Sequence, residues 1–266
     1  MRQRELRIMQ LLDERGDVRV DELAETLGVS SVTVRKDLEH LESGGHLIRT
    51  RGGAVGAAFR EGEFPKRLRI DVAAKQAVAH AAARLVVDGD VVAFDTSSSA
   101  YFVAREVVDR QDLVVVTSSL PIATLFLSRS AARIIMPGGL VRRESSGLVG
   151  GSADQLIGLG RISKGFFGIT GLSVERGLLE FAPEESATKR MLVDACTDVH
   201  AVFASEKASG FGFHAFCPTD AITSLVTDDR LDADVAATWR ALGVGVELAP
   251  FLEAESPMAS ADVPSE

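Results

Sequence analysis

Residues 18–54, VRVDELAETLGVSSVTVRKDLEHLESGGHLIRTRGGA, predict two helices joined by a tight turn. We expect Asp21 to cap the first helix, because a side-chain oxygen at that position accepts a hydrogen bond from a free N–H of the first turn. Gly28 stands where a left-handed residue ends such a helix, and Ser30 is placed to cap the next helix. A short turn with a glycine is typical of two helices that cross steeply.

The second of these helices has one apolar and one polar face. Val34, Leu38 and Leu41 fall at positions i, i+4 and i+7, so we expect them to form the buried stripe. The start of the opposite face is then free to enter the major groove, where its side chains reach base edges, phosphates and thymine methyl groups. The residues of this helix that we expect to contact DNA are Ser31, Val32, Thr33, Arg35 and Lys36.

A two-stranded wing is predicted after this helix. Gly-Gly pairs at 44–45 and 52–53 turn the chain, and residues 46–51 between them alternate in polarity. Arg49 and Arg51 fall on one side of the first wing strand, where they can reach the DNA backbone or the minor groove.

A small helical subdomain with a solvated charged face would show a similar helix pattern, so the pattern alone leaves that alternative open. The run V-S-x-x-T-V-R-K-D-L-x-x-L-E at residues 29–42 and R-x-R-G-G-A at residues 49–54 add specific motifs. With the glycine turn, they resemble the N-terminal signature of DeoR-type bacterial transcriptional regulators, over residues 2–54. The resemblance implies a winged helix-turn-helix that binds an operator in double-stranded DNA.

Length and composition predict a cytoplasmic protein of two domains. The chain has 266 residues, 46% of them hydrophobic, which allows a substantial core. No apolar run approaches the ~18 residues of a membrane span, and no secretory signal is present. Cys196 and Cys217 lack CxxC spacing, and the five histidines lack metal-ligand spacing. We therefore expect reduced thiols, no metal, no cofactor and no membrane contact.

The charge argues against a nonspecific nucleic-acid coat. The net charge is −9, and residues 1–57 hold nine Lys and Arg against ten Asp and Glu. A protein that coats DNA is strongly basic, because each neutralised phosphate contributes to affinity. We therefore expect local DNA contacts and a homo-oligomer, a dimer or a tetramer, that supplies more than one DNA-binding domain.

Composition shifts divide the chain into four segments. We expect a DNA-binding domain at residues 1–57, a linker with the start of a connecting helix at 58–74, an effector-sensing domain at 75–250 and a disordered tail at 251–266.

Short apolar segments alternate with helical segments through the second domain. The expected strands are residues 91–94, 113–117, 133–136, 166–170, 200–204, 222–227 and 244–248. The expected helices are residues 73–87, 100–108, 121–127, 153–159, 184–193 and 234–242. This alternation predicts an α/β fold, with a mostly parallel sheet covered by helices on both faces.

Residues 95–99, DTSSS, suggest an anion site at the end of the first strand of this domain. Asp95 is followed by the hydroxyls of Ser97, Ser98 and Ser99 at the start of a helix, whose free N–H groups and dipole favour an anion. The alternative is that these hydroxyls only cap the helix.

Other strand ends of a parallel sheet meet at the same edge, where ligands bind. The candidates there are Ser118, Gly138, Gly139, Gly168 and Gly171, with Glu185 and with Lys75, Lys189 and Lys207 to neutralise a phosphate. The alternatives are that each lysine is a solvated surface charge, and that Glu185 and Lys189 form a surface i, i+4 pair.

The second domain resembles the DeoR sensor domain over residues 75–228, through Lys75, D-G-D at 88–90, Asp95 with its hydroxyl loop, and the glycines at 138–139 and 168–171. The family's domain is similar to ribose-5-phosphate isomerase and binds phosphorylated sugars or related metabolites. The resemblance implies that Asp95 and the three serines bind phosphate or sugar hydroxyls, with the three lysines around them.

The sequence departs from this family at several positions. The family usually has Gly-Thr-Thr at residues 97–99, often Asn at Ser118, and commonly Asp at Ser163 and Ala204. Loss of two carboxylates would change the hydroxyl pattern that is preferred, whereas anion binding by the serine loop is unaffected.

The first hypothesis is a DNA-binding transcriptional regulator, a repressor of carbohydrate-metabolism genes, that a phosphorylated sugar or related metabolite controls. The alternatives are a sugar-phosphate isomerase with an appended DNA-binding domain, and a protein-interaction module whose pocket is vestigial. An isomerase needs a carboxylate base near the substrate carbon. Asp95 has no second carboxylate close in sequence, so we expect no catalytic residues and no enzyme activity.

Overall fold

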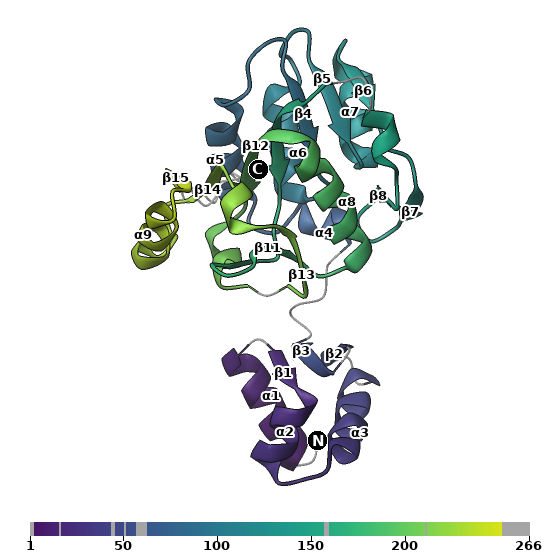
Figure 1. Ribbon diagram of the computed structural model, residues 1–266, viewed down its shortest axis with the longest axis vertical. Coiled ribbons are helices and arrows are strands. Elements are labelled where there is room, and N and C mark those ends of the chain that lie inside the picture. Colours follow the sequence, from purple (N-terminus) through teal and green to yellow (C-terminus); the bar gives the residue numbers. More distant parts are fainter. Residues whose placement is uncertain are drawn as a thin grey trace, which may run out of the picture.

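The computed structural model describes residues 3–15, 17–43, 46–50, 52–56, 63–156, 160–210 and 212–251. Figure 1 shows a small N-terminal domain and a larger α/β domain. The expected disordered tail, beyond Phe251, lies outside the described residues. Among the helices that are described, none has the length and apolar character needed to cross a bilayer.

The N-terminal domain is a winged helix-turn-helix. Its helices are α1 (Gln3–Arg15), α2 (Val20–Leu27) and α3 (Ser31–Ser43), and its strands are β1 (Asp17–Arg19), β2 (Leu47–Thr50) and β3 (Gly53–Gly56). The strands pair antiparallel in the order β1-β3-β2, so the predicted wing has a third strand that the sequence pattern did not indicate. The predicted stripe of Val34, Leu38 and Leu41 is fully buried.

Two of the three predicted turn and cap residues are confirmed. Gly28 ends α2 in the left-handed conformation (φ 63°), and Ser30 Oγ accepts the N–H of Thr33 at 3.2 Å. The prediction that Asp21 caps α2 is wrong, because α2 already begins at Val20. The Val20 N–H donates to the carbonyl of Gly52 at 2.8 Å, so the wing supplies a partner and the helix starts directly after β1.

The larger domain is built on a seven-stranded parallel sheet, as predicted. The strand order is β15-β14-β12-β9-β4-β5-β6, and every neighbouring pair is parallel. The strands are β4 (Val91–Phe94), β5 (Val114–Thr117), β6 (Arg133–Ile135), β9 (Ile162–Phe167), β12 (Cys196–Val202), β14 (Ser224–Asp228) and β15 (Gly245–Ala249).

Helices cover both faces of this sheet (Figure 1). Helices α5 (Val72–Ala83), α6 (Ser98–Val107) and α7 (Leu120–Arg129) enclose one core, in which Phe94, Phe126 and Phe166 stack. Helices α8 (Pro183–Ala195) and α9 (Ala233–Ala241) enclose the other core, around Phe167 and Trp239.

Several short elements were not predicted. The hairpin β7 (Leu140–Arg142)–β8 (Gly147–Val149) and the antiparallel sheet of β10 (Gly171–Ser173), β11 (Gly177–Glu180) and β13 (His214–Cys217) are three- and four-residue strands. Strands this short are too brief for a pattern of alternating hydrophobicity. The remaining short elements are α4 (Phe64–Arg67), η2 (Ala153–Leu156), η3 (Ser205–Ser209) and η4 (Thr219–Ala221).

Four predicted elements have wrong bounds. The strand expected at 200–204 is β12, which starts at Cys196 and ends at Val202, and the helix expected at 73–87 is α5, which ends at Ala83. The strand expected at 166–170 is β9, which starts four residues earlier and ends at Phe167. The helix expected at 153–159 is the single 3₁₀ turn η2 over the residues that the structure describes, and residues 157–159 lie outside them.

Candidate functional site

The outer face of α3 is available to a partner. Val32 is 59% exposed, Arg35 and Lys36 are exposed, and Ser31 and Thr33 are half-buried. The hydroxyls of Thr33 and Ser30 lie 2.9 Å apart, which places Thr33 against the start of the helix. The face that the sequence analysis proposed for DNA therefore projects away from the core of the domain.

The wing arginine Arg49 lies against α3. Its Nη1 is 3.7 Å from Glu39 Oε1 and 4.0 Å from Glu42 Oε2, and its backbone N–H donates to Glu42 at 2.9 Å. These contacts hold the first wing strand beside the end of the helix. Arg51 lies outside the described residues.

Arg4, in the first turn of α1, joins that helix to α3. Its guanidinium contacts the carboxylate of the buried Asp37, with Nη2 at 2.9 Å from Oδ1.

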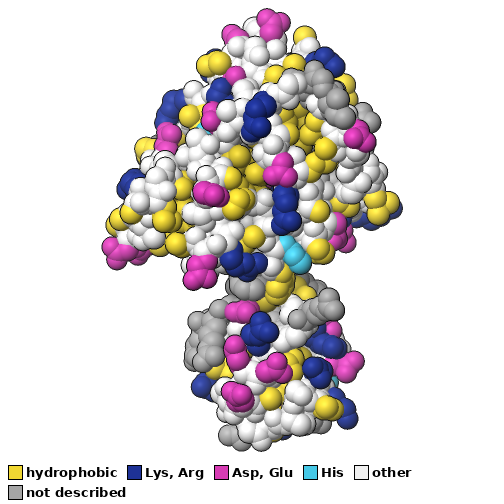
Figure 2. Space-filling view, viewed as in Figure 1, with side chains coloured by type: hydrophobic (Ala, Val, Ile, Leu, Met, Phe, Trp, Pro, Cys, Tyr) yellow, Lys and Arg dark blue, Asp and Glu magenta, His cyan; other side chains and the backbone are white. Residues whose placement is uncertain are grey.

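Positive and negative side chains lie interspersed over the face of the molecule shown in Figure 2. This distribution agrees with local rather than extended contact with DNA.

Asp95 lies at the carboxyl edge of the parallel sheet, directly after β4, and both of its oxygens are used. Oδ1 accepts the N–H of Ser97 at 2.9 Å, and Oδ2 accepts the N–H of Gly168 at 2.9 Å. Lys189 Nζ lies 2.9 Å from the same Oδ2. Asp95 thus ties the loop after β4 to the loop after β9.

Lys189 is the buried centre of this network. Its Nζ donates to the carbonyl of Gly168 at 2.8 Å, pairs with Asp95 and Glu180, and lies 4.9 Å from the centre of the Phe216 ring. Burial by itself would lower the pKa of Lys189, but Asp95 and Glu180 outweigh it and raise that pKa above its usual value. Lys189 therefore stays charged and acts as an internal clamp. The alternative of a surface pair with Glu185 is wrong.

Glu185 instead faces the loop after β4 from α8. It accepts the hydroxyl of Thr96 at 2.8 Å, and its Oε1 lies 3.7 Å from Nη1 of Arg142, which ends β7. Glu185 is almost fully buried. It joins three elements that are far apart in the sequence.

The serine loop is divided between two roles. Ser97 Oγ accepts the N–H of Ala100 at 3.0 Å and caps α6, so the capping alternative is correct for this residue. The hydroxyls of Ser98, Ser99 and Ser118 make no hydrogen bond with another described residue, although all three residues are buried. The first-turn N–H groups of α6 have no carbonyl within the helix to bond.

Lys75 fastens the segment before α5. Its Nζ donates to the backbone carbonyls of Arg67, at 2.6 Å, and of Ile70. Burial, and after it the charge of Lys207, lowers the pKa of Lys75 to about 8. The structure thus gives Lys75 a structural role in addition to any role toward a ligand.

This pKa predicts how stability changes in alkaline solution. An unfolded lysine has a pKa of about 10.4, so between pH 8 and pH 10 the unfolded chain binds more protons at this position than the folded protein. The contribution of Lys75 to the free energy of unfolding is therefore expected to rise with pH in this window. Urea unfolding at pH 7.5 and pH 9.5 should show a gain for the wild type relative to Lys75→Met. Parallel pH dependence of the two proteins would contradict the assignment.

Lys207 differs from the other two lysines. It lies in η3, just after β12, and its Nζ has no described residue at hydrogen-bond or ion-pair distance. Burial first, and then the charge of Arg67, lowers the pKa of Lys207. Of the three lysines, Lys207 is the one whose charge no partner in the described chain neutralises closely.

The structure also shows what surrounds the glycines that the sequence analysis singled out. A Cβ on Gly139 would lie 2.2 Å from the carbonyl oxygen of Val149, and one on Gly168 would lie 2.3 Å from the Cβ of Ser97. These glycines let the chain pack on itself. Gly138 has φ 76°, and Gly171 begins β10.

Of the two positions where the resemblance implied aspartate, only Ala204 is at the carboxyl edge of the sheet. Ser163 lies at the start of β9, where its hydroxyl donates to the carbonyl of Val91 at 2.7 Å, so it is at the opposite edge of the sheet. Ser163 is therefore not among the residues at the carboxyl edge, where the ligand was expected. Ala204 follows β12 and is buried at the ligand edge.

Sequence reasoning missed Arg142 and Glu180, and it did not foresee that Thr96 of the anion loop bonds Glu185. Arg142 and Glu180 lie in the short strands that were not predicted, and no motif marks them.

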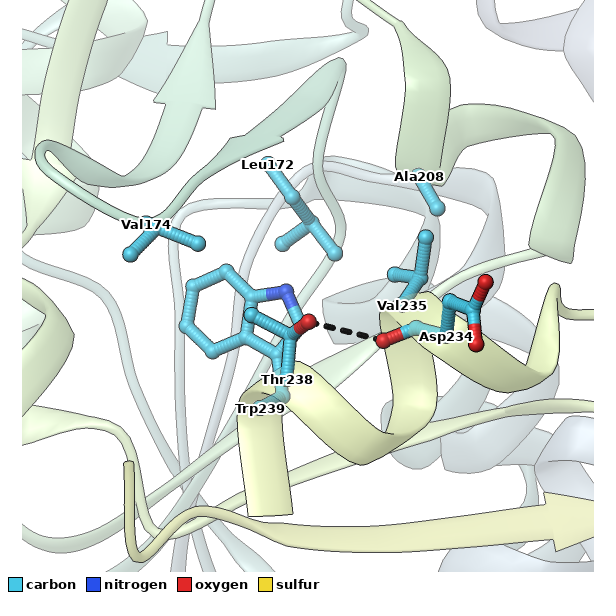
Figure 3. Close-up of a pocket in the computed structure, with 7 residues that line it drawn as sticks. All are labelled: Leu172, Val174, Ala208, Asp234, Val235, Thr238 and Trp239. Carbon is cyan, nitrogen blue, oxygen red and sulfur yellow. Dashed lines mark hydrogen bonds between the residues drawn. The ribbon is translucent and has the colours of Figure 1, made fainter. Parts of the chain in front are cut away.

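A separate cavity of about 330 Å³ lies between α9, β10 and η3. Figure 3 shows its walls, which are mainly apolar and include Trp239, with Thr238 Oγ1 donating to the carbonyl of Asp234 at 2.7 Å. This cavity contains none of the predicted ligand residues.

Comparison with known proteins covers both domains. Residues 4–58 match the DeoR-like helix-turn-helix domain, and residues 70–229 match the DeoR C terminal sensor domain. The transcriptional regulator GlpR of Haloferax volcanii is 30% identical, over 92% of this chain and 96% of that protein. The lactose phosphotransferase system repressor of Staphylococcus aureus is 28% identical, over 83% and 89%.

Among solved structures, ribose 5 phosphate isomerase A of Neisseria gonorrhoeae aligns with a TM-score of 0.39 and 10% identity, over 50% of this chain and 52% of that chain. The family and the named relatives are transcriptional regulators and not enzymes. With a helix-turn-helix and a sensor domain that both match, this chain belongs to the DeoR family of transcriptional regulators.

Proposed function

We propose that the protein is a repressor of carbohydrate-metabolism genes that releases its operator when a phosphorylated sugar, or a related metabolite, binds the sensor domain. One observation carries the proposal: the chain combines an exposed α3 face in one domain with a buried, hydroxyl-rich strand edge in the other. The names of the Staphylococcus aureus and Haloferax volcanii relatives, a sugar-system repressor and a regulator, support it.

The phosphate would sit at the N-terminus of α6. The hydroxyls of Ser98, Ser99 and Ser118 and the first-turn N–H groups supply donors, and the helix dipole favours the negative charge. Lys207 supplies the positive charge. Asp95, Lys189 and Glu185 hold the loops in place through their internal contacts, and Lys75 holds the segment before α5.

The DNA would be read by Ser31, Val32, Thr33, Arg35 and Lys36 of α3, with Arg49 and Arg51 of the wing on the backbone. One such domain has few basic residues, so a dimer or a tetramer is needed to reach useful affinity. A dimer would read half-sites about 34 Å apart, or a multiple of that spacing. We place this protein in the cytoplasm, where operator DNA and sugar phosphates are found.

The proposed domain division follows the two cores. Residues 1–57 bind DNA, residues 58–74 connect, residues 75–250 sense the effector, and residues 251–266 form a tail. In support, the hydrophobic cluster around Leu38 and the clusters around Phe94 and Phe167 contain separate sets of residues. The connecting segment includes α4, whose Phe64 is buried beside the sensor domain.

Thermal denaturation with a panel of sugar phosphates and their unphosphorylated parent sugars tests this function. A ligand that binds only the folded protein at 100 times its Kd adds about 2.7 kcal/mol to the free energy of unfolding. We expect at least one sugar phosphate, and not its parent sugar, to raise Tm and to lower affinity for a duplex that the protein selects from a random DNA pool. A panel without any Tm increase, or a protein that selects no duplex, would overturn the proposal.

Lys207→Met is expected to weaken binding of that sugar phosphate by about tenfold or more, because a hydrogen bond to a charged group contributes about 1.5–3 kcal/mol. Titration by isothermal calorimetry measures the change. Lys66→Met is the matched control, since Lys66 is largely exposed and, among the described residues, pairs with Glu63 alone, at 3.3 Å. Equal Kd values for the two variants would show that Lys207 does not bind the phosphate.

A further inference from the structure

The hairpin β7–β8 packs against the proposed effector edge. We call its turn, residues 142–147, the relay turn. The N–H of Leu148 donates to the carbonyl of Ser118 at 2.8 Å, and the N–H of Leu120 donates to the carbonyl of Ser146 at 3.1 Å. Ser119 and Gly147 also form an antiparallel bridge. The loop after β5 and the relay turn are therefore joined by backbone hydrogen bonds and must move together.

The relay turn is also fitted closely to the loop after β4. A Cβ on Gly147 would lie 2.3 Å from Cγ2 of Thr96, so only glycine allows this approach. At the other end of the turn, Arg142 Nε lies 3.4 Å from Glu184, and Arg142 Nη1 lies 3.7 Å from Glu185. Because Glu185 accepts the hydroxyl of Thr96, the loop, α8 and the turn form one connected set.

On its other side the relay turn holds the chain that leads to the DNA-binding domain. The N–H of Phe64, the first residue of α4, donates to the carbonyl of Glu144 at 2.8 Å. The buried Phe64 ring meets Tyr101 edge to face, with ring centroids 5.6 Å apart. Tyr101 belongs to α6, the helix whose N-terminus is the proposed phosphate site. Phe64 thus contacts α6, which the effector would touch, and the relay turn, which is bonded to the loop after β5.

We propose that effector binding is transmitted to the DNA-binding domain through the relay turn and Phe64. A phosphate that orders the loops after β4 and β5 shifts the relay turn, because the turn is bonded to one loop and in van der Waals contact with the other. The shift changes the position of Phe64. It thereby moves the start of the segment whose carbonyls, at Arg67 and Ile70, accept hydrogen bonds from Lys75. The effector then changes DNA affinity by favouring one position of this connection. This inference rests on the proposed function, which supplies the phosphate.

Phe64→Leu is the first test, because it removes the ring that contacts Tyr101 but keeps an apolar side chain and the backbone hydrogen bond. The probe is inorganic phosphate at a concentration that saturates the Tm increase, with chloride at matched ionic strength as the reference. The readouts are Tm, hydrogen exchange of the peptide covering residues 63–70, and the ratio of affinities for the selected duplex without and with phosphate.

In the wild type we expect phosphate to change exchange of this peptide and to lower duplex affinity. Allosteric coupling is usually 5- to 150-fold in affinity. In Phe64→Leu we expect the Tm increase to remain and the affinity ratio to fall toward one, by fivefold or more. Phe126→Leu, which shortens a buried ring in the core of the sensor domain, is the control and should keep the wild-type ratio.

Gly147→Ala tests the relay turn independently, since the added Cβ meets the methyl group of Thr96. We expect it to reduce the affinity ratio, and Gly147→Ala/Thr96→Ser, which removes that methyl group and keeps the hydroxyl, to restore part of it. A wild-type ratio in both Phe64→Leu and Gly147→Ala would overturn the relay while leaving the proposed function intact. A wild type that responds neither to inorganic phosphate nor to any sugar phosphate of the panel, in Tm or in duplex affinity, would overturn both.

Discussion

Replacing Lys189 by methionine is expected to lower the free energy of unfolding by about 3–5 kcal/mol, because the substitution leaves two buried carboxylates without their counter-charge. Asp95 and Glu180 are almost fully buried, and both pair with Lys189 Nζ. Methionine fills a similar volume, so the loss reports on charge and not on a cavity. Urea denaturation followed by circular dichroism measures the change.

The loss should depend on pH in a defined direction. In the wild type, burial alone would raise the pKa of Glu180, but Lys189 brings it below its usual value. That stability is present at neutral pH and is lost as pH falls through the folded pKa. In Lys189→Met the carboxylates repel one another, the pKa of Glu180 rises because burial is no longer offset by Lys189, and its protonation relieves the repulsion. The difference between the two proteins should therefore be larger at pH 7 than at pH 5.

Lys164→Met is a matched control for this prediction. Lys164 pairs with Asp90 at 2.8 Å, but the two side chains are 20% and 11% exposed, so water can solvate the carboxylate that is left. We expect a loss of about 1 kcal/mol or less, in line with partly exposed pairs. Equal losses for Lys164→Met and Lys189→Met, or a Lys189→Met loss that does not change with pH, would contradict the role of Lys189 as a buried clamp.

Arg35→Ala is expected to reduce discrimination between the selected duplex and a scrambled duplex by about 1–3 kcal/mol, if Arg35 makes a bidentate contact with a guanine. Arg35 is exposed on the face of α3 that lies opposite its buried stripe. The affinity for scrambled DNA should change little by comparison, since phosphate contacts are shared by all sequences. Fluorescence polarisation with both duplexes at one salt concentration gives the two affinities.

Arg110→Ala, an exposed arginine of the sensor domain, changes the net charge by the same amount and should leave discrimination unaltered. If Arg35→Ala weakened both duplexes equally, Arg35 would be a phosphate contact. If it weakened neither duplex, the outer face of α3 would not be the face that reads DNA.

The features that the sequence predicted correctly are those that local spacing decides. The positions of Val34, Leu38 and Leu41 orient α3 whatever surrounds it, since a helix repeats every 3.6 residues. Gly28 and Ser30 were predicted correctly because each determines the conformation of only the few residues beside it. The apolar runs of β4, β5 and β14 predict buried parallel strands, and a parallel sheet brings their carboxyl ends to one edge. Asp21 was wrongly predicted to cap α2, because the Val20 N–H at the start of that helix donates to the carbonyl of Gly52, which lies in the wing.

The roles of the charged residues were settled only by the tertiary structure. Three lysines were equivalent in the sequence, but Lys189 is enclosed by Asp95 and Glu180, and Lys75 is held by two backbone carbonyls. Lys207 has no ion-pair partner among the described residues. Pairing energies depend on distance and burial, and both are set by strands that meet across the sheet edge from distant parts of the chain. Periodicity and caps act within a few residues, so the sequence determined the helices and strands. Charge pairing acts through space, so the packing determined which charged side chains have an ion-pair partner.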